Sequence, residues 1–377
     1  MQTEQRRWTA RDGWSGASGV NRSAQLVIIF GGTSVLKEGS RLRELRGVYP
    51  QAQFLGCSTA GEIFDTQVMD DSLVSTAIRF EQTTVKGVQT TLENAQQSQD
   101  VGQRLAGQLP KDGLVHVFIL SDGLNVNGSE LVEGLRSRLP AGVTVTGGLS
   151  GDGARFAETL VVWGDEPRKN SIAAIGLYGK HLRVGYASLG GWDPFGPERL
   201  VTRSKGNVLF ELDGQSALDL YKKYLGDHAN DLPASGLLFP LSVRPASGDT
   251  AVVRTILSID EKERSLTFAG DIPRGSYARL MKANVNRLVD GAHGAARISY
   301  EAVGSSSPDL ALLISCVGRK LVLKQRVEEE VESVREVLGP RTVMTGFYSY
   351  GEISPFTPSA RCELHNQTMT ITTLLES

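Results

Sequence analysis

Short, continuous apolar runs dominate the hydrophobic pattern of this chain. Residues 26–30, 115–120 and 310–314 are apolar at nearly every position, which is typical of strands buried on both faces. Each run precedes a segment with apolar residues at helical spacing. In the third segment Val327, Val331, Val334 and Leu338 share one helix face, and Gly339 with Pro340 ends the helix. The pattern predicts a strand followed by a helix, three times.

One spacing recurs after each predicted helix. A proline stands 11 positions before a glycine that is followed by an acidic residue, at Pro50, Pro140 and Pro340. A short β-prone run lies between the proline and the glycine in every copy. The three copies end in Gly61-Glu62, Gly151-Asp152 and Gly351-Glu352. The agreement in spacing and element order indicates a duplicated unit, and we expect the three Gly-acid loops at equivalent strand ends.

A further apolar strand follows each Gly-acid loop, at residues 72–80, 171–178 and 369–375. Strand, helix, strand in that order implies a right-handed crossover and parallel pairing, and we expect the additional strand to pair antiparallel. The expected fold class is therefore α/β, with mixed sheets built from repeated β-α-β-β units in two domains.

We expect a domain boundary in the loop-like residues 226–237. Residues 1–22 read as a flexible N-terminal extension, residues 23–226 as the first domain, and residues 238–377 as the second. The second domain would begin with a hairpin at residues 252–259 and 265–269, and a helix at 285–298 would lead into the third unit.

Composition narrows the function classes. The chain has 40 Lys and Arg against 42 Asp and Glu, so its net charge of −2 offers no basic face for nucleic acid. Three cysteines without a CxxC pair favour a reducing, cytoplasmic setting. The apolar runs are far shorter than the roughly 18 residues of a membrane helix, so we expect neither a membrane span nor a membrane-surface patch.

Common catalytic motifs are absent from the sequence. There is no phosphate loop, dinucleotide turn, nucleophile elbow or HExxH pair, and the five histidines are scattered. A zinc site formed by neighbouring residues is therefore excluded, although one assembled in space is not.

The Gly-acid loops are the most conspicuous polar features, because ligands bind beyond the carboxyl ends of strands in open α/β sheets. They either line a shared ligand pocket or serve as turns in which the acid caps the backbone. The candidate pocket residues are Cys57, Ser58, Thr59, Gly61, Glu62, Asp152, Tyr350, Gly351, Glu352 and Gln367.

Cys57 and three histidines are the candidates for reactive or ligating groups. Cys57 could act as a nucleophile beside a base, but no histidine is near it in sequence and a buried thiol is the commoner case. Strand alternation places His365 and Gln367 on one face, in a pocket or in a buried network. His228 lies on the expected interdomain loop and His293 on a predicted helix surface.

Several motifs resemble the FIST family of sensory domains. The resemblance to the N-terminal FIST domain is carried by residues 56–63, the loop at 147–152 and the helix entry at 212–221. Residues 351–353 and the His-Asn-Gln-Thr segment at 365–368 are similar to the C-terminal FIST domain. The resemblance covers about residue 26 to the end and implies a signal-transduction module that binds a small ligand.

Residues 225–228, 236–241 and 315–323 are similar to a bacterial branch of that family that binds haem and senses nitric oxide. This resemblance implies non-covalent haem b, with His228 or His365 as the axial metal ligand and His293 behind them. It also implies output through a partner histidine kinase or cyclic-di-GMP enzyme. A homodimer is possible within this interpretation.

Other functions stay open on the sequence. A sensor of an amino-acid-like metabolite would use the Gly-acid loops and no metal. An enzyme would bring Cys57 near a histidine, or Glu62 near Glu352. A plain scaffold would have neither pocket nor ligand.

Overall fold

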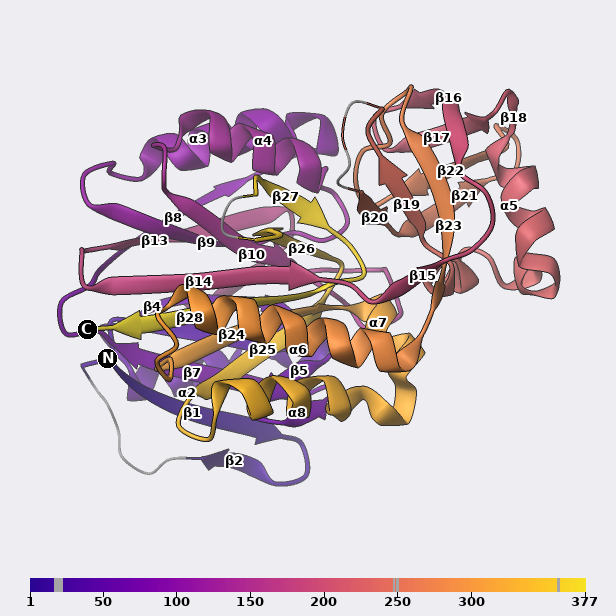
Figure 1. Cartoon of the computed structure of the whole chain (residues 1–377). Coiled ribbons are helices and arrows are strands. Elements are labelled where there is room, and N and C mark those ends of the chain that lie inside the picture. The colour runs from indigo at the N-terminus through magenta and orange to yellow at the C-terminus, as the bar shows by residue number, and fades with distance from the viewer. Residues whose placement is uncertain (17–22, 247, 249–250, 358–359) are drawn as a thin grey trace.

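The structure is a computed structural model that describes residues 1–16, 23–246, 248, 251–357 and 360–377. It consists of a main body of three mixed sheets and a smaller body of β-strands with one helix (Figure 1). The smaller body is formed by residues between β14 (Leu182–Leu189) and α6 (Val285–Ala302).

The three sheets of the main body repeat one strand order. At the centre of each sheet lie the two strands of one repeat, next to the additional strand of the same repeat. The first sheet is β12 (Glu166–Arg168), β11 (Val161–Trp163), β4 (Gln53–Ser58), β3 (Leu26–Gly31), β7 (Leu73–Arg79), β1 (Gln2–Thr9) and β2 (Gly13–Gly16). The second sheet is β27 (Cys362–His365), β26 (Gly351–Pro355), β10 (Thr144–Leu149), β9 (Leu114–Ser121), β13 (Ser171–Tyr178) and β8 (Thr84–Thr91). The third sheet is β6 (Gln67–Met69), β5 (Glu62–Phe64), β25 (Val343–Ser349), β24 (Leu310–Cys316), β28 (Met369–Glu376) and β14.

The predicted pairing is confirmed in every repeat. β3 pairs in parallel with β4, β9 with β10, and β24 with β25. The additional strands β7, β13 and β28 pair antiparallel with the first strand of their own repeat. The Gly-acid loops all follow the second parallel strand, so the expected equivalence of the three loops is also confirmed.

The strands that follow the Gly-acid loops cross to a neighbouring sheet, which the sequence pattern does not predict. β5 and β6 of the first repeat pair beside β25 of the third. β11 and β12 of the second repeat pair beside β4 of the first, and β26 and β27 of the third pair beside β10 of the second. The three repeats therefore interlock in a ring.

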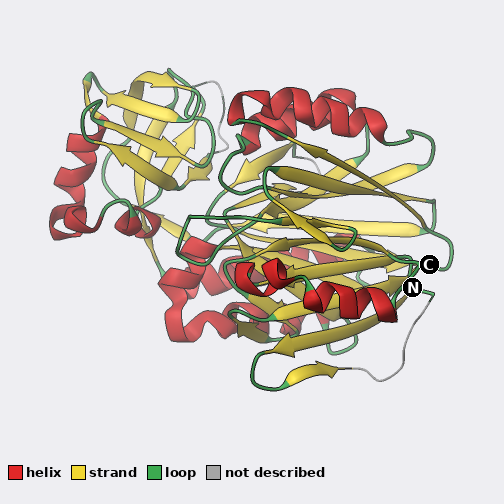
Figure 2. Ribbon diagram, turned by 180° about the vertical axis from the view of Figure 1, so that it is seen from behind, coloured by secondary structure: helices red, strands yellow, loops and turns green. Residues whose placement is uncertain are grey.

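Strand alternation divides the apolar runs between a central core and an outer layer. In β3, Leu26, Ile28 and Phe30 belong to a core shared with β9 and β24, and the Phe30 ring stacks on Phe347 at 4.7 Å. Val27 and Ile29 face the other way and pack against helices. The inner faces of three sheets thus close on one core, with helices outside (Figures 1 and 2).

Helices cover the outer face of each sheet. Each covering group comes largely from the connections between strands of the repeats. The helices are α1 (Thr33–Glu38), α2 (Ser40–Val48), α3 (Ser98–Gln108), α4 (Gly128–Arg138), α6, α7 (Val317–Leu323) and α8 (Val327–Leu338), with short 3-10 turns at Ala95–Gln97 and Lys324–Arg326. The predicted helix at 285–298 is confirmed as the first part of α6.

One glycine in each repeat permits the close approach of the two parallel strands. A Cβ at Gly56 would lie 2.3 Å from the Ile29 carbonyl oxygen, and one at Gly147 would lie 1.9 Å from that of Ile119. At Gly346 it would lie 1.8 Å from the carbonyl oxygen of Leu313. Any larger residue at these positions would push the strands apart.

The smaller body has its own core around α5 (Ala217–Leu225). Its remaining elements are β15 (Trp192–Pro194), β16 (Arg199–Lys205), β17 (Val208–Leu212), β18 (Gln215–Ser216), β19 (Leu241–Arg244), β20 (Val252–Arg254), β21 (Ile256–Asp260), β22 (Ser265–Phe268), β23 (Tyr277–Ala283) and 3-10 turns at Gly226–Asp231 and Ala234–Leu238. β21 and β22 form the hairpin expected at residues 252–259 and 265–269, but residues 252–254 belong to the separate strand β20, which pairs with β19.

The two ranges expected as domains, 23–226 and 238–377, do not correspond to separate bodies. Strands from both ranges pair in the second and third sheets, as β10 does with β26 and β14 does with β28. The expected linker lies inside the smaller body, where Leu225, Leu237 and Leu241 are buried. The physical reason is that the hairpin after each Gly-acid loop pairs in the sheet of another repeat, so the sheets need strands from both ends of the chain.

The expectation of a flexible extension at residues 1–22 is wrong for residues 2–16. β1 pairs along its length with β7, and β2 pairs with β1. Trp8 and Trp14 of this hairpin pack against the core beneath α2, so burial of aromatic surface holds it in place. Residues 17–22 lie outside the described residues.

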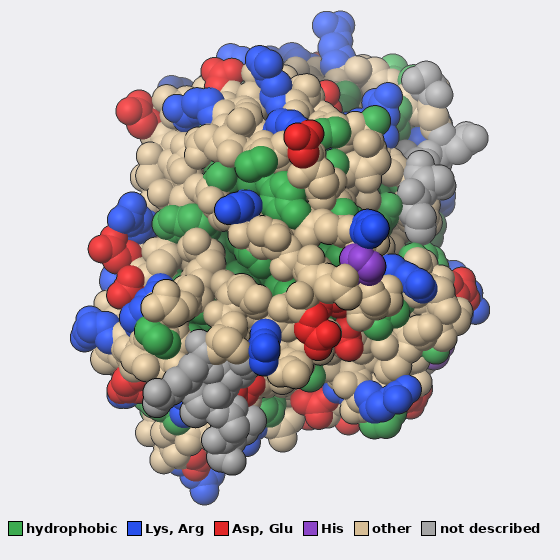
Figure 3. All heavy atoms as spheres, turned by 90° about the vertical axis from the view of Figure 1, so that its left-hand side faces the viewer, with side chains coloured by type: hydrophobic (Ala, Val, Ile, Leu, Met, Phe, Trp, Pro, Cys, Tyr) green, Lys and Arg blue, Asp and Glu red, His purple; other side chains and the backbone are tan. Residues whose placement is uncertain are grey.

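None of the helices in the described ranges is long and apolar enough to cross a membrane. On the face in Figure 3, acidic and basic side chains are interspersed, in line with the small net charge.

Candidate functional site

A cavity of about 490 Å³ lies between the main body and the smaller body. We call it the interbody cleft. The main body contributes residues of α4 and β27, and the smaller body contributes β19, β20 and the segment before β23. The lining residues are Ser129, Val132, Glu133, Arg136, Val243, Pro245, Gly248, Val252, Arg254, Asp271, Pro273, Ser276, Arg361, Cys362, Glu363 and Leu364.

Arg254 lines this cleft as a buried cation without a carboxylate partner. The side chain is 6% exposed, its Nη1 donates to the Leu364 carbonyl oxygen at 2.8 Å, and its Nε donates to that of Asp271 at 3.3 Å. It forms no ion pair with any residue in the described part of the chain. Burial lowers the pKa of Arg254 to about 10, against the opposing effect of the Glu363 and Asp271 charges, so the group stays charged at neutral pH. Since buried charges are normally paired, this guanidinium is available to an anionic group of a ligand.

Charges of both signs surround Arg254. Arg136 pairs with Glu133 at 3.1 Å, and Asp271 accepts a hydrogen bond from Asn127 at 2.8 Å. Arg361 is exposed and makes no ion pair among the described residues. With Glu363 also in the lining, the cleft presents groups for a carboxylate and for an ammonium.

The His-Asn-Gln-Thr segment joins the two bodies beside the cleft. Asn366 Oδ1 accepts a hydrogen bond from the Thr255 amide at 3.4 Å, and its Nδ2 donates to the Tyr350 carbonyl oxygen at 3.3 Å. Gln367 Nε2 donates to the Leu237 carbonyl oxygen and to Thr255 Oγ1, both at 3.1 Å. These contacts connect the turn between β27 and β28 in the main body to Thr255, between β20 and β21, and to the 3-10 turn at Ala234–Leu238 in the smaller body.

Gln367 carries two signs of strain within this junction. Its φ of +64° lies in the left-handed region, and its buried Oε1 has no hydrogen-bond partner among the described residues. The Trp192 indole also donates to the Gln367 carbonyl oxygen at 2.9 Å. Such a residue persists only where surrounding contacts hold it, so the junction is a specific contact between the bodies.

A second cavity, of about 410 Å³, adjoins the interbody cleft. The two share Arg136, Arg361 and Cys362. The second cavity is otherwise lined by residues 139–145, Tyr186, Pro355 and Ala360. The second cavity is therefore a neighbour of the cleft that lies toward the start of β10 and the end of β26.

The three candidate histidines do not come together. His365 is buried, with Nε2 2.7 Å from the Ser354 carbonyl oxygen and the Phe356 ring 4.1 Å from its own, and burial lowers its pKa to about 3. His228 is exposed on a 3-10 turn beside the Phe239 ring, at 5.4 Å. His293 is exposed on α6.

These positions do not fit a haem in the described arrangement. An axial histidine needs a free ring nitrogen at the wall of a large apolar slot. None of the three histidines lines any of five cavities in the described part of the chain. The remaining ring nitrogen of His365, Nδ1, is buried and has no hydrogen-bond partner among the described residues.

The Gly-acid carboxyl groups act within the fold. Glu62 accepts hydrogen bonds from Thr59 Oγ1 and from the Ser72 amide and hydroxyl, at 3.0 and 2.6 Å for Ser72. Glu352 accepts from Ser349 Oγ at 2.6 Å and from the Thr368 amide and hydroxyl at 3.2 and 2.9 Å. Each carboxyl group thus fixes the start of the next strand of its own repeat.

Burial raises the pKa of Glu62 to about 7 and that of Glu352 to about 8, against the opposing effect of these donors. Asp152 differs. Burial alone would raise its pKa, but hydrogen bonds from Arg155, Thr33 and the Glu158 amide outweigh burial and lower it.

The three Gly-acid loops meet but leave no described pocket. Backbone hydrogen bonds run from Gly151 to Ser58 at 2.8 Å, from Ala60 to Tyr348 at 2.8 Å, and from Tyr350 to Leu149 at 3.2 Å. The candidate residues Cys57, Ser58, Thr59, Gly61, Glu62, Asp152, Tyr350, Gly351, Glu352 and Gln367 are all buried, and none lines one of the five cavities. The geometry supports turns that interlock the repeats.

Cys57 has the surroundings of a structural thiol. Burial raises its pKa well above the ordinary value, and Ser150 and Glu62 are the polar groups that act on it. A thiol with a raised pKa is a poor nucleophile. No cluster of three histidine, cysteine, aspartate or glutamate residues suited to a metal is found within the described ranges.

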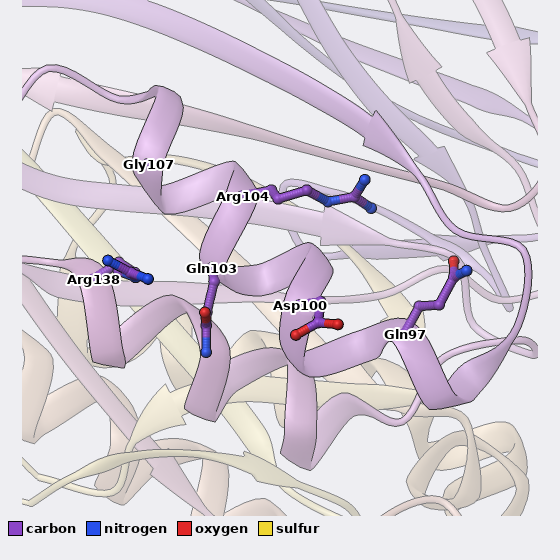
Figure 4. Close-up of a pocket in the computed structure, with 6 residues that line it drawn as sticks. All are labelled: Gln97, Asp100, Gln103, Arg104, Gly107 and Arg138. Atoms are coloured by element: carbon purple, nitrogen blue, oxygen red, sulfur yellow. The ribbon is translucent and has the colours of Figure 1, made fainter.

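A further hollow of about 530 Å³ lies on the outer surface of α3 and α4 (Figure 4). Its residues are polar and mostly exposed, including Asp100, Arg104 and Arg138. It lacks a buried polar group like Arg254, so it is the weaker candidate for a ligand site.

Sequence reasoning missed Arg254, Arg361 and the other residues of the interbody cleft. Nothing in the alternation of residues 252–259 distinguishes Arg254 from an arginine at a solvent-facing strand position. Its burial arises only when β20 is placed against β27. Gln367 is the one predicted pocket residue whose side chain contacts both bodies.

Comparison with known proteins finds family matches to both halves of the chain. The sequence model of the FIST N domain matches residues 25–215, and that of the FIST C domain matches residues 217–355. Among curated proteins, the chain is 23% identical over 345 residues to the uncharacterized protein MJ1623 of Methanocaldococcus jannaschii. The match covers 83% of this chain but only 64% of that relative's length.

Among solved structures, cyanuric acid hydrolase from A. caulinodans matches at 11% identity with a TM-score of 0.18. The match covers 78% of this chain and 99% of the hydrolase.

Proposed function

The chain belongs to the FIST family, whose domains imply a role in signal sensing, and from this premise we propose that it senses a small anionic ligand bound in the interbody cleft. The observation that supports the proposal is Arg254, a buried guanidinium that lines a cavity and forms no direct ion pair among the described residues, although the charges of Glu363 and Asp271 act on it. An anionic group would satisfy it with a charge-assisted hydrogen bond.

An amino-acid-like metabolite suits the other groups of the cleft. Its carboxylate would face Arg254, its ammonium group would face Asp271 or Glu363, and its side chain would lie against Val132 or Val243. This is the alternative that the sequence left open, now with a different set of binding residues.

Ligand binding would be transmitted by the relative placement of the two bodies. The cleft has one wall on each body, so a ligand that contacts both stabilises the arrangement in which the walls are close. The altered surface would then be recognised by a signalling partner. From the resemblance, a histidine kinase or a cyclic-di-GMP enzyme is the proposed partner.

The test is a thermal-shift screen of the purified full chain against free amino acids and dicarboxylates. A ligand at 100 times its Kd adds about 2.7 kcal/mol to the free energy of unfolding, which raises the Tm by several degrees. Arg254→Gln should abolish this rise. Arg203→Gln, on the exposed side of the smaller body, is the matched control and should retain it. A rise that survives Arg254→Gln would contradict the proposed site.

Haem with nitric oxide sensing is the rival proposal, and it rests on the resemblance alone. The described positions of His228, His365 and His293 give it no support. Titration with haemin separates the two ideas. A saturable, stoichiometric Soret band that is lost in His228→Ala or His365→Ala would favour haem, whereas a colourless protein that is stabilised by carboxylates would favour the cleft.

A further inference from the structure

The second sheet of the main body ends in β8, a long strand with an exposed edge. Six strands stand at the ends of the three sheets, and the other five are short or covered. β2, β6 and β12 have only three or four residues, and β27 packs against β20. The Ser188 amide of β14 donates to the Phe356 carbonyl oxygen at 3.2 Å. β8 has eight residues, and β13 and α3 are the described elements that contact it extensively.

The pairing of β8 with β13 shows which of its backbone groups point outward. The Leu92 amide donates to the Asn170 carbonyl oxygen at 3.0 Å, whereas the Ser171 carbonyl oxygen, opposite Thr91, accepts from the Asp122 amide after β9 at 2.9 Å. Backbone groups of alternate residues in an antiparallel pair point to the same side, and the register has no shift along β8. Residues 84, 86, 88 and 90 therefore bond to β13. The residues with outward N–H and C=O groups are Val85, Gly87, Gln89 and Thr91.

β8 lacks the features that commonly keep a strand edge from pairing. Natural edges are protected by proline, by charged side chains, by bulges or by a covering segment. β8 contains no proline, and Lys86 is its single charged residue. Val85 and Val88 are only partly buried. The outward N–H and C=O groups are therefore able to pair with another strand.

A second copy of the same strand is complementary to this edge. Two antiparallel β8 strands related by a two-fold axis at Val88 use all four outward residues. Val85 then pairs with Thr91 of the second copy, and Gly87 pairs with Gln89. A register shifted by two residues would place a residue from outside β8 opposite one of these four. The symmetric register is therefore the one that satisfies the most backbone groups.

Charge complementarity favours the same pairing. In the register about residue 88, Lys86 faces Thr90 of the second copy, so like charges do not oppose each other. α3 packs over the β8 end of the sheet, and its exposed Asp100 and Arg104 form no ion pair within the described ranges. Figure 4 shows Arg104 on the side of α3 away from Arg138 of α4. A two-fold axis sets the two α3 helices antiparallel, so the acidic position of one helix can lie near the basic position of the other.

We propose that the outer edge of β8 is the interface between two copies of this chain, which pair antiparallel and join their second sheets into one. The inference goes beyond the proposed function, because the interbody cleft lies at β27, the opposite end of the second sheet. One sheet then connects the cleft at one end with the dimer interface at the other. The homodimer that the sequence left open is thereby given a specific surface.

Sedimentation velocity of the purified full chain over a range of protein concentrations tests the interface, and we expect a reversible dimer. Gln89→Pro removes an outward N–H from each copy and puts a pyrrolidine ring in the interface, although the ladder with β13 does not use this N–H. It should weaken dimerisation by about tenfold or more. Gln89→Ala is the matched control. It loses the same side-chain bond to Ser171 but keeps the N–H, so it should dimerise like the unmodified protein.

Substitutions at Thr90 test the register without altering the backbone. Thr90→Glu places a carboxylate opposite Lys86 of the second copy, and symmetry repeats the pair, so the dimer should tighten about fivefold. Thr90→Lys opposes two lysines at both places and should weaken the dimer by a similar factor. Thr90 is only partly buried, so the fold should tolerate both changes. These variants decide the question if circular dichroism shows that Gln89→Pro does not fold.

Three results would overturn the proposal. A monomer at every concentration would exclude the dimer. A dimer that persists unchanged in folded Gln89→Pro would place the interface elsewhere on the molecule. Equal effects of Thr90→Glu and Thr90→Lys would contradict the antiparallel register. The thermal-shift screen for cleft ligands does not depend on these results, so their failure would leave the proposed function intact.

Discussion

Arg319 and Arg254 are both buried arginines, yet their surroundings differ. Arg319 pairs with Glu330 at 2.7 Å and donates to the carbonyl oxygens of Gly190 and Leu288 at 3.1 and 2.8 Å. Its charge is compensated inside the main body. Arg254 hydrogen-bonds to carbonyl oxygens and feels the charges of Glu363 and Asp271, but it forms no direct ion pair among the described residues. Of these two buried arginines, Arg254 is therefore the one for which a bound ligand can supply an anionic partner.

The buried carboxyl group of Glu352 predicts that the stability of the protein depends on pH. Burial raises its pKa to about 8, whereas an unfolded glutamate titrates near 4.3. Between these values the unfolded state has lost the proton and the folded state keeps it. The unfolding free energy should therefore fall as pH rises through this window, by about 1.4 kcal/mol per pH unit for one such group. Glu352→Gln should flatten the decline, as measured by urea unfolding at pH 5, 6, 7 and 8.

Glu133→Gln is the matched control for this measurement, because Glu133 is exposed on α4 and forms its ion pair with the partly exposed Arg136. It should leave the pH dependence unchanged. Glu62, with a pKa raised to about 7, adds a decline over a narrower range that remains in Glu352→Gln. An unaltered slope in Glu352→Gln would mean that the carboxyl group is ionised in the folded protein.

At the scale of elements, the repeat depends on parallel strands that approach closely at one glycine. Gly56, Gly147 and Gly346 occupy this place, each against the carbonyl oxygen of the neighbouring strand. Counted from the proline of each repeat, Gly56 and Gly346 occupy the same position, and the residue at that position in the second repeat is Thr146. The structure shifts the second repeat by one residue, to Gly147, because the strand register and not the distance from the proline decides the contact.

Gly346→Ala should lower the unfolding free energy by about 3 kcal/mol, because its Cβ would lie 1.8 Å from the Leu313 carbonyl oxygen. Gly47→Ala is the control, since Gly47 is exposed in α2 with no atom within 4 Å of the new Cβ. It should stabilise by roughly 0.5–1 kcal/mol through helix propensity. Denaturant unfolding measures both. Equal effects of the two substitutions would contradict the proposed role of the close approach.

At the scale of the whole molecule, two features hold the chain together: the hairpins that pair in the sheet of another repeat, and the junction between the two bodies at residues 366–367. The hairpins bind the three repeats into one main body. The smaller body meets it through Asn366, Gln367 and Arg254, which all contact residues across the boundary. Motion between the bodies is therefore the change that a ligand in the cleft would bias.

Asn366→Ala should loosen this boundary while the main body stays folded. It removes the acceptor of the Thr255 amide and the donor to Tyr350. Loss of a hydrogen bond worth about 1 kcal/mol predicts roughly fivefold faster amide exchange. Hydrogen exchange of residues 252–256 measures the effect. Asn125→Ala, which removes an exposed contact with Asn170, should not change exchange there. Unchanged exchange in Asn366→Ala would show that other contacts hold the bodies together.

The sequence by itself determined the repeated units, because burial on both faces of a strand leaves a continuous apolar run and a crossover helix leaves its own period. β3, β9 and β24, their parallel partners and the helix α8 all follow from such local patterns. The sequence also pointed to the Gly-acid loops, since glycine and a capping acid are local requirements of a turn.

Only the tertiary structure decided which sheet each hairpin joins, that residues 2–16 pair with β7, and that Arg254 is buried beside a cleft. The local sequence does not specify which strand edge a hairpin pairs with, because backbone hydrogen bonds are the same for nearly every residue. Burial of a single polar side chain depends on what packs against it from a distant part of the chain. The fold class was therefore readable from local pattern, whereas the candidate site, built from segments near residues 136, 254 and 362, exists only where the two bodies meet.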